Sequence, residues 1–152
     1  MKINYKKLIL IIIVTILVGG IFAFLTMNNT TYKSLNKPIN IPEVVFPIVW
    51  VILYILMSIS IYLISEEKYI NKSKSYLIYI IQLIMNSLWT LFFFGLKWYG
   101  FSALWILLLI VVVFIMIYNF LKINKKAGLI QIPYVIWLFF ALYLNISIAT
   151  LN

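Results

Sequence analysis

The chain has 152 residues, of which 66% are hydrophobic and only 10% are charged, and its formal net charge is +9. So few charged side chains cannot cover the surface of a water-soluble domain of this length. The composition therefore excludes a soluble globular protein and predicts an integral membrane protein.

Five long apolar runs account for most of the chain. Each is close to the roughly 20 residues that a helix needs to cross a hydrocarbon core of about 30 Å. None shows the alternating pattern of a membrane β-barrel strand. We therefore predict an all-α membrane protein, a single five-helix bundle over residues 1–152. The predicted spans are residues 8–25, 44–64, 76–94, 99–121 and 129–150.

The first run follows Lys2, Lys6 and Lys7, as the apolar part of a secretory signal peptide would. It is longer than a usual signal-peptide core and no A-x-A cleavage site follows it, so we expect a retained membrane helix. Gly19 and Ala23 form a small-xxx-small pair within it, which favours the close approach of a neighbouring helix. The alternative is that the glycine merely loosens this helix.

The lysines are distributed unevenly along the chain. Nine of the twelve lie at the N-terminus and in the second and fourth loops, and three lie in the first and third loops. Cytoplasmic loops carry the excess of positive charge, so the N-terminus is expected inside and the C-terminus outside. The positive net charge is then explained by the orientation of the protein in the membrane, and it does not predict a nucleic-acid partner.

The connector between the first two spans, residues 26–43, reads "TMNNTTYKSLNKPINIPE". Its Asn, Thr and Pro residues favour turns over helix. Pro38 and Pro42 are expected to stiffen its second half. The connector is either a lid over a site on the outer side or a simple linker.

In the third run, Gln82, Asn86, Trp89 and Phe93 follow the spacing i, i+4, i+7, i+11 and so share one stripe of a helix. An unpaired amide that faces lipid costs a few kcal/mol. The stripe should therefore face the interior of the bundle. Its amides either join helices by hydrogen bonds or line a ligand pocket.

Two other runs carry aromatic residues on one face. Trp50 and Tyr54 are spaced i, i+4 in the second run, and Trp137, Ala141 and Asn145 repeat every fourth residue in the fifth. Tryptophan usually marks the membrane interface, but Trp50 and Trp137 lie turns away from their span ends. These patterns predict a pocket for a flat apolar ligand in the outer half of the bundle. The alternative is a packed aromatic core.

The sequence offers little for ordinary enzyme chemistry. It contains no Cys and no His, and its only acidic residues, Glu43, Glu66 and Glu67, lie at or beyond span ends. We therefore predict no catalytic residue and no metal site. The lack of an ionisable group deep in a span also disfavours an ion-coupled transporter.

Four segments make the chain resemble the TspO/MBR family, the tryptophan-rich sensory proteins related to the mitochondrial translocator protein. They are "YKSLNKP", "PEVVFPIVWVILY", "QLIMNSLWTLFF" and "AGLIQIPYVIWLFFALYLNISIATLN", in this order from residue 32 to residue 152. The resemblance implies a five-helix bundle, often homodimeric, that binds porphyrins and other tetrapyrroles in a pocket closed by the first loop.

The resemblance also implies roles for single residues. Trp50 and Trp137 match two pocket tryptophans that are linked in bacterial members to light-dependent porphyrin breakdown. The other matching positions are Tyr54, Asn86, Trp89 and Ala141 in the pocket, and Tyr32 and Pro38 in the loop that closes it. The helical stripe adds Phe93 to the expected pocket, and the stiffening argument adds Pro42 to the expected lid.

The chain departs from the family pattern in this loop. Asn40 stands where the family usually has Trp, Glu43 where it has a second Pro, and Thr31 where a Trp often occurs. No basic residue follows Lys126, so the sterol motif proposed for the family is absent. We do not predict cholesterol transport.

These patterns together predict a receptor for porphyrins and related tetrapyrroles in the cytoplasmic membrane of a bacterium. Whether the protein also supports light-dependent breakdown of its ligand stays open, and ordinary enzyme catalysis is not expected. The alternatives are a facilitative transporter of tetrapyrroles or other small hydrophobic ligands, and a membrane scaffold without a ligand. The expected partners are a haem-like or porphyrin ligand, the lipid bilayer and a second copy in a homodimer, with no obligatory cofactor.

Overall fold

The computed structural model describes residues 3–26, 31–69 and 71–152, without the side chains of Thr31 and Tyr32. Within these residues the chain is helical and contains no strand. Five helical segments are long and apolar enough to cross a membrane, so the predicted all-α five-helix fold is confirmed. The helices are α1 Tyr5–Thr26, α2 Thr31–Ser34, α3 Val45–Glu66, α4 Ser73–Thr90 with its π-helical continuation η1 Leu91–Gly95, α5 Tyr99–Ile123, α6 Lys125–Leu129 and α7 Ile132–Leu151.

Local sequence explains where several helices begin. Pro47 is the third residue of α3 and Pro133 the second residue of α7, positions whose N–H groups have no partner within the helix. Asn124 interrupts the chain between α5 and α6 with an extended backbone, and its side chain accepts a hydrogen bond from the Ala127 N–H at 3.1 Å. This break separates α5 from α6, and a turn at Ile130 and Gln131 separates α6 from α7.

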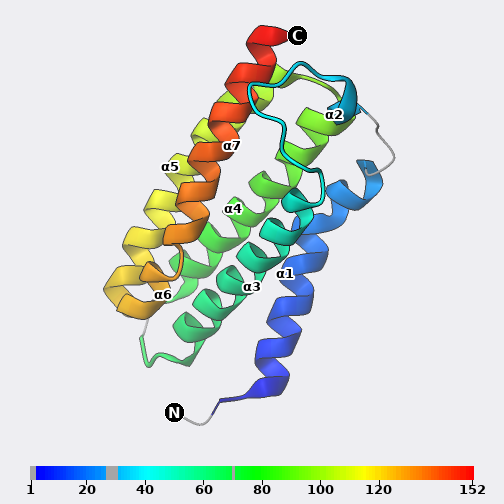
Figure 1. The fold of residues 1–152 in the computed structure, drawn as a ribbon. Helices are drawn as coiled ribbons and strands as arrows, with labels where there is room; N and C mark the ends of the chain where they lie inside the picture. Colours follow the sequence, from blue (N-terminus) through cyan, green and yellow to red (C-terminus); the bar gives the residue numbers. More distant parts are fainter. Residues whose placement is uncertain (1–2, 27–30, 70) are drawn as a thin grey trace.

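The helices run side by side, with the start of α1 at one end of the bundle and the connector and the C-terminus at the other (Figure 1). α5 packs against α4 and α7, and α1 packs against α3 and α4. α3 and α7 hardly approach each other, since almost none of their Cα atoms come within 8 Å of the other helix, and α3 contacts α6 instead. Contact between α3 and α7 therefore depends on their side chains.

The connector differs from the prediction in containing a short helix, α2, where turns were expected. α2 is a single turn, and the chain after it is irregular as far as Pro42. A longer helix could not pass Pro38, because proline lacks an N–H group and disfavours helix in the residue before it. Thr26, predicted to belong to the connector, is the last residue of α1.

An asparagine pair attaches the connector to the end of α7. The Asn36 N–H donates to Asn152 Oδ1 at 3.0 Å, and Asn152 Nδ2 donates to the Asn36 carbonyl oxygen at 3.0 Å. Asn36 Nδ2 also donates to the Leu151 carbonyl oxygen at 3.3 Å, and Leu35 packs against the buried core. The connector therefore lies across this end of the bundle, as Figure 1 shows.

Tyr54 explains the need for a glycine in α1. Tyr54 packs so closely on Gly19 that a Cβ atom there would lie 2.5 Å from its ring, and its hydroxyl donates to the Gly19 carbonyl oxygen at 2.8 Å. The other buried residue of α1 is Thr15, whereas Ala23, the predicted partner of Gly19 in a small-xxx-small pair, is exposed. The Thr15 hydroxyl forms a hydrogen bond with the Tyr79 hydroxyl at 2.7 Å.

Charged groups gather at the end of the bundle opposite the connector. Lys7 pairs with Glu66 at 2.7 Å and so joins α1 to α3. The Asn124 side chain donates to Glu67 at 2.6 Å, which joins the start of α6 to the end of α3. Both carboxylates thus find partners outside the apolar centre of the bundle.

Gly19→Ala is expected to destabilise the bundle, because the added methyl group would overlap the Tyr54 ring. Overpacking of this kind costs about 1–3 kcal/mol. Gly20→Ala is the matched control, since a Cβ at Gly20 meets nothing within 4 Å and alanine favours a helix. In thermal denaturation in detergent, only Gly19→Ala should lower the midpoint. Equal midpoints for the two variants would contradict the close contact between α1 and Tyr54.

Candidate ligand site

Trp50 is the centre of an aromatic cluster that joins three helices. Its ring stacks on Tyr54 at a centroid distance of 5.7 Å and lies 6.0 Å from Trp89 of α4. On α7, Tyr134 and Trp137 each meet Trp50 edge-on at 6.3 Å. Each aromatic pair contributes about 0.5–1.5 kcal/mol beyond its buried area. The cluster therefore connects α3 to α7 where their backbones stay apart.

A small cavity, the aromatic cavity, lies beside this cluster. Its free volume is about 20 Å³, which is room for roughly one water molecule. Pockets for small molecules usually measure about 300–1,000 Å³, so this conformation is closed to such a ligand. The walls are Phe46 and Trp50 of α3, Trp89, Phe93 and Phe94 of α4 and η1, and Phe140, Trp137, Ala141, Leu144, Asn145 and Ile148 of α7.

Two consecutive phenylalanines reach the cavity from the π-helical turn η1. The Leu96 N–H donates to the Leu91 carbonyl oxygen at 2.8 Å, and this bond to the fifth preceding residue defines a π turn. Phe93 and Phe94 meet edge to face at 4.8 Å, and Trp89 stacks on Phe93 at 5.7 Å. Such turns are frequent at functional sites, and here the turn forms one wall of the cavity.

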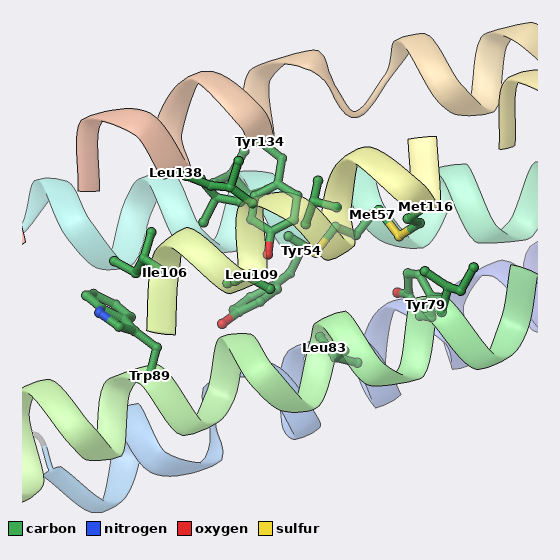
Figure 2. Packing of buried hydrophobic residues seen from close by; sticks show 14 of the residues in the cluster. Tyr54, Met57, Tyr79, Leu83, Trp89, Ile106, Leu109, Met116, Tyr134 and Leu138 are labelled. Carbon is green, nitrogen blue, oxygen red and sulfur yellow. The ribbon is translucent and has the colours of Figure 1, made fainter. Parts of the chain in front are cut away.

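One turn further from the connector lies a set of buried polar side chains, the polar network, formed by Tyr54, Gln82, Asn86 and Tyr134. The Tyr54 hydroxyl lies 2.9 Å from Asn86 Oδ1, and the Asn86 amide donates to the Tyr134 hydroxyl at 3.0 Å. Tyr134 donates in turn to Gln82 Oε1 at 3.0 Å. Because hydrocarbon supplies no hydrogen bonds, these groups must satisfy one another. Figure 2 shows Tyr54 and Tyr134 extending into the centre of the bundle.

Asn145 holds a second hydrogen-bonded group at the cavity wall. Its Oδ1 accepts from the Trp89 indole at 3.2 Å and from the Ser102 hydroxyl at 2.7 Å. Its amide donates to the Ala141 carbonyl oxygen at 2.9 Å. These bonds join α4, α5 and α7 and fix the ring of Trp89 in place.

Trp137 lacks such a bond. Its indole nitrogen is buried and has no hydrogen-bond partner among the described residues. Leaving a buried donor unpaired costs about 1–3 kcal/mol. A ligand with an acceptor atom beside Trp137 would remove this cost, so the cavity combines aromatic faces with a buried, unpaired donor at Trp137.

The structure brings five of the predicted pocket residues together. Trp50, Trp89, Phe93, Trp137 and Ala141 all line the aromatic cavity. They come from α3, α4, η1 and α7, which are distant in sequence. The helical stripes in the sequence thus converge on one place in the fold.

The other predicted site residues lie outside the cavity wall. Tyr54 and Asn86 belong to the polar network, where their side chains are occupied by hydrogen bonds. Pro38 and Pro42 are exposed in the connector. The side chain of Tyr32 lies outside the described part of the structure.

Six wall residues were not predicted as pocket residues: Phe46, Phe94, Phe140, Leu144, Asn145 and Ile148. Asn145 shares the helical stripe of Trp137 and Ala141, so its position in the sequence could have identified it. Phe46 and Phe140 carry no such signal, because they are two of eleven phenylalanines in uniformly apolar runs. Only their packing in the fold distinguishes them.

Comparison with known proteins finds similarity over nearly the whole chain. The profile of the TspO/MBR family matches residues 9–151. The tryptophan-rich protein TspO of Archaeoglobus fulgidus is 32% identical over 157 residues, which cover 98% of this chain and 99% of the relative. The tryptophan-rich sensory protein of Cereibacter sphaeroides is 33% identical over 122 residues, 80% of this chain and 76% of the relative. Protein CrtK of Rhodobacter capsulatus is 38% identical over 124 residues, 80% of this chain and 78% of the relative.

Asn145→Ala is expected to destabilise the protein by about 1–3 kcal/mol, because it leaves the buried Trp89 indole without its acceptor. The Ser102 hydroxyl keeps the Tyr99 carbonyl oxygen as an acceptor at 2.8 Å. Asn119→Ala is the control, since within the described part of the chain the Asn119 amide donates only to the Ile115 carbonyl oxygen of its own helix. Thermal denaturation in detergent measures the stability of both variants. Equal losses of stability would show that Asn145 does not fix the cavity wall.

Proposed function

The chain is a multi-pass membrane protein of the TspO/MBR family, and we propose that it is a receptor that binds a flat, largely apolar tetrapyrrole such as a porphyrin. The observation that carries the proposal is the meeting of Trp50, Trp89 and Trp137 from three helices around one cavity. Large aromatic faces suit a flat conjugated ring, whose burial and stacking would supply most of the binding free energy.

Binding in this cavity requires the aromatic walls to move apart. Trp50 and Trp137 meet perpendicular to each other with centroids 6.3 Å apart. A flat ring between two parallel indoles needs about 7 Å, twice the optimal carbon–carbon separation of about 3.5 Å. Opening would break the edge-to-face contact between Trp50 and Trp137 and would form two stacked contacts with the ligand. The stacking would therefore compensate for the free energy needed to separate the two rings.

The free donor of Trp137 supports a ligand that carries acceptor atoms. Porphyrins bear carboxylates and ring nitrogens, and an acceptor placed at the Trp137 indole would pair a buried donor that has no partner among the described residues. Asn86, in contrast, already bonds Tyr54 and Tyr134. We therefore assign ligand recognition to Trp137 and a supporting role to Asn86.

The proposed activity is reception of the ligand rather than ordinary catalysis. The cavity walls offer aromatic rings and one amide, and the sequence contains no Cys or His. In any light-dependent breakdown, the bound porphyrin would absorb the light and dioxygen would be the oxidant. The wall tryptophans would then act as electron donors beside the ring.

The proposed setting is the cytoplasmic membrane of a bacterium, in which the protein forms a homodimer. Nine of the twelve lysines belong to the N-terminal segment and to the loops after the second and fourth spans. The described parts of these segments lie at the end of the bundle opposite the connector (Figure 1). The positive-inside rule then puts that end in the cytoplasm and the connector outside.

Titration of the detergent-purified protein with protoporphyrin IX in the dark tests this function. Quenching of tryptophan emission should saturate at micromolar ligand, and Trp137→Phe should weaken the affinity about tenfold, since a hydrogen bond to a charged group contributes about 1.5–3 kcal/mol. Trp98→Phe is the control, because Trp98 is exposed and outside the cavity. Linear quenching without saturation, equal in all three proteins, would contradict the proposal.

A further inference from the structure

A second hollow, the lateral groove, lies on the side of the bundle between α3 and α7. Its volume is about 560 Å³, within the range of about 300–1,000 Å³ that small-molecule sites occupy. The groove exists because α3 and α7 hardly approach each other. Its walls are Val49, Ile52, Leu53, Pro133, Ile136, Trp137 and Phe140, all apolar residues.

The lateral groove faces the hydrocarbon layer rather than water. Trp137 is the thirteenth residue of the 27-residue segment Lys125–Leu151, near its middle. On the rim, Ile52 and Ile136 are exposed although both are large and apolar. In a membrane these side chains contact lipid, so the groove is open to molecules dissolved in the bilayer.

The lateral groove and the aromatic cavity share two wall residues. Trp137 and Phe140 line both hollows, and their rings contact each other at a centroid distance of 5.3 Å. The Trp137 side chain has no hydrogen bond to another described residue that would hold it in this position. Rotation of these two rings would therefore join the two hollows without breaking a hydrogen bond of Trp137.

The route past the connector is more firmly held. Asn36 and Asn152 exchange hydrogen bonds of 3.0 Å, and Asn36 bonds the Leu151 carbonyl oxygen as well. Leu35 packs against the buried core. Access from this end requires those bonds to break and Leu35 to leave its packed position.

We propose that the ligand enters sideways from the bilayer: the lateral groove is the first binding site of a membrane-dissolved, flat, apolar tetrapyrrole, and Trp137 and Phe140 form the gate to the aromatic cavity. The inference rests on the proposed function and adds the route to it. The occupant follows from the apolar walls, the matching volume and the continuity of the groove with the cavity. The free Trp137 donor is the first polar group that a porphyrin acceptor meets on this route.

Ile136→Trp tests the route by filling the groove. Ile136 lines the groove and is 64% exposed, so an indole there meets lipid and groove without entering the core. Ile146→Trp is the matched control, because Ile146 is a 50% exposed residue of the same helix that lines neither hollow. Association of protoporphyrin IX with protein in lipid nanodiscs is followed by the absorbance of the porphyrin, against empty nanodiscs.

Ile136→Trp should slow association and dissociation together by about tenfold, because a blocked route raises the barrier in both directions. The dissociation constant should hardly change, and Ile146→Trp should behave like the wild type. The chain contains no cysteine, so Asn36→Cys/Asn152→Cys can be bridged with a short bismaleimide to hold the connector shut. This bridged protein should bind at the wild-type rate.

Equal association rates for Ile136→Trp and Ile146→Trp would overturn the lateral route, and so would a bridged connector that prevents binding. Both results presuppose saturable binding by the wild type, so they leave the proposed function intact. Absence of saturable binding by the wild type would instead remove the proposed function, and the route with it.

Discussion

The bundle depends on the polar network at its centre, because no water is present there to satisfy an amide or a phenol hydroxyl. Asn86 of α4 bonds Tyr54 of α3 and Tyr134 of α7, and Tyr54 reaches the Gly19 carbonyl oxygen of α1. Four helices thus meet in one set of directional bonds, and sliding any helix by one residue would leave a buried polar group unpaired at a cost of about 1–3 kcal/mol. The close contact at Gly19 and the positions of the aromatic rings follow from this arrangement.

The cavity walls combine fixed and adjustable parts. Trp89 is fixed, since Asn145 accepts its indole hydrogen and bonds α5 and α7 as well. Trp50 and Trp137 are held by ring contacts, which tolerate displacement better than hydrogen bonds do because their preferred geometry is broad. A closed cavity of about 20 Å³ can therefore belong to a binding protein, provided that the adjustable rings move and the polar network beneath them does not.

The sequence predicted the five-helix fold because the length of an apolar run depends only on membrane thickness. It also predicted that Gln82 and Trp89 face inward, and both are buried, because helical spacing decides which residues share a face. It could not predict that the Asn86 side chain would bond two tyrosines. Helical spacing shows which face of a helix a residue lies on, but not which side chain of a neighbouring helix it contacts. The closed cavity was likewise unpredictable, because it depends on how rings from three helices pack together.

The gap between α3 and α7 has a thermodynamic consequence. In a bilayer, a groove of about 560 Å³ that opens onto hydrocarbon is filled by acyl chains, so no molecule occupies it without displacing lipid. Occupancy is then an exchange reaction, and its free energy is the difference between the packing of the incoming molecule and that of the departing chain against the same side chains. Chain length and saturation of the surrounding lipid enter that difference directly, so the apparent affinity is a joint property of the protein and the membrane that contains it.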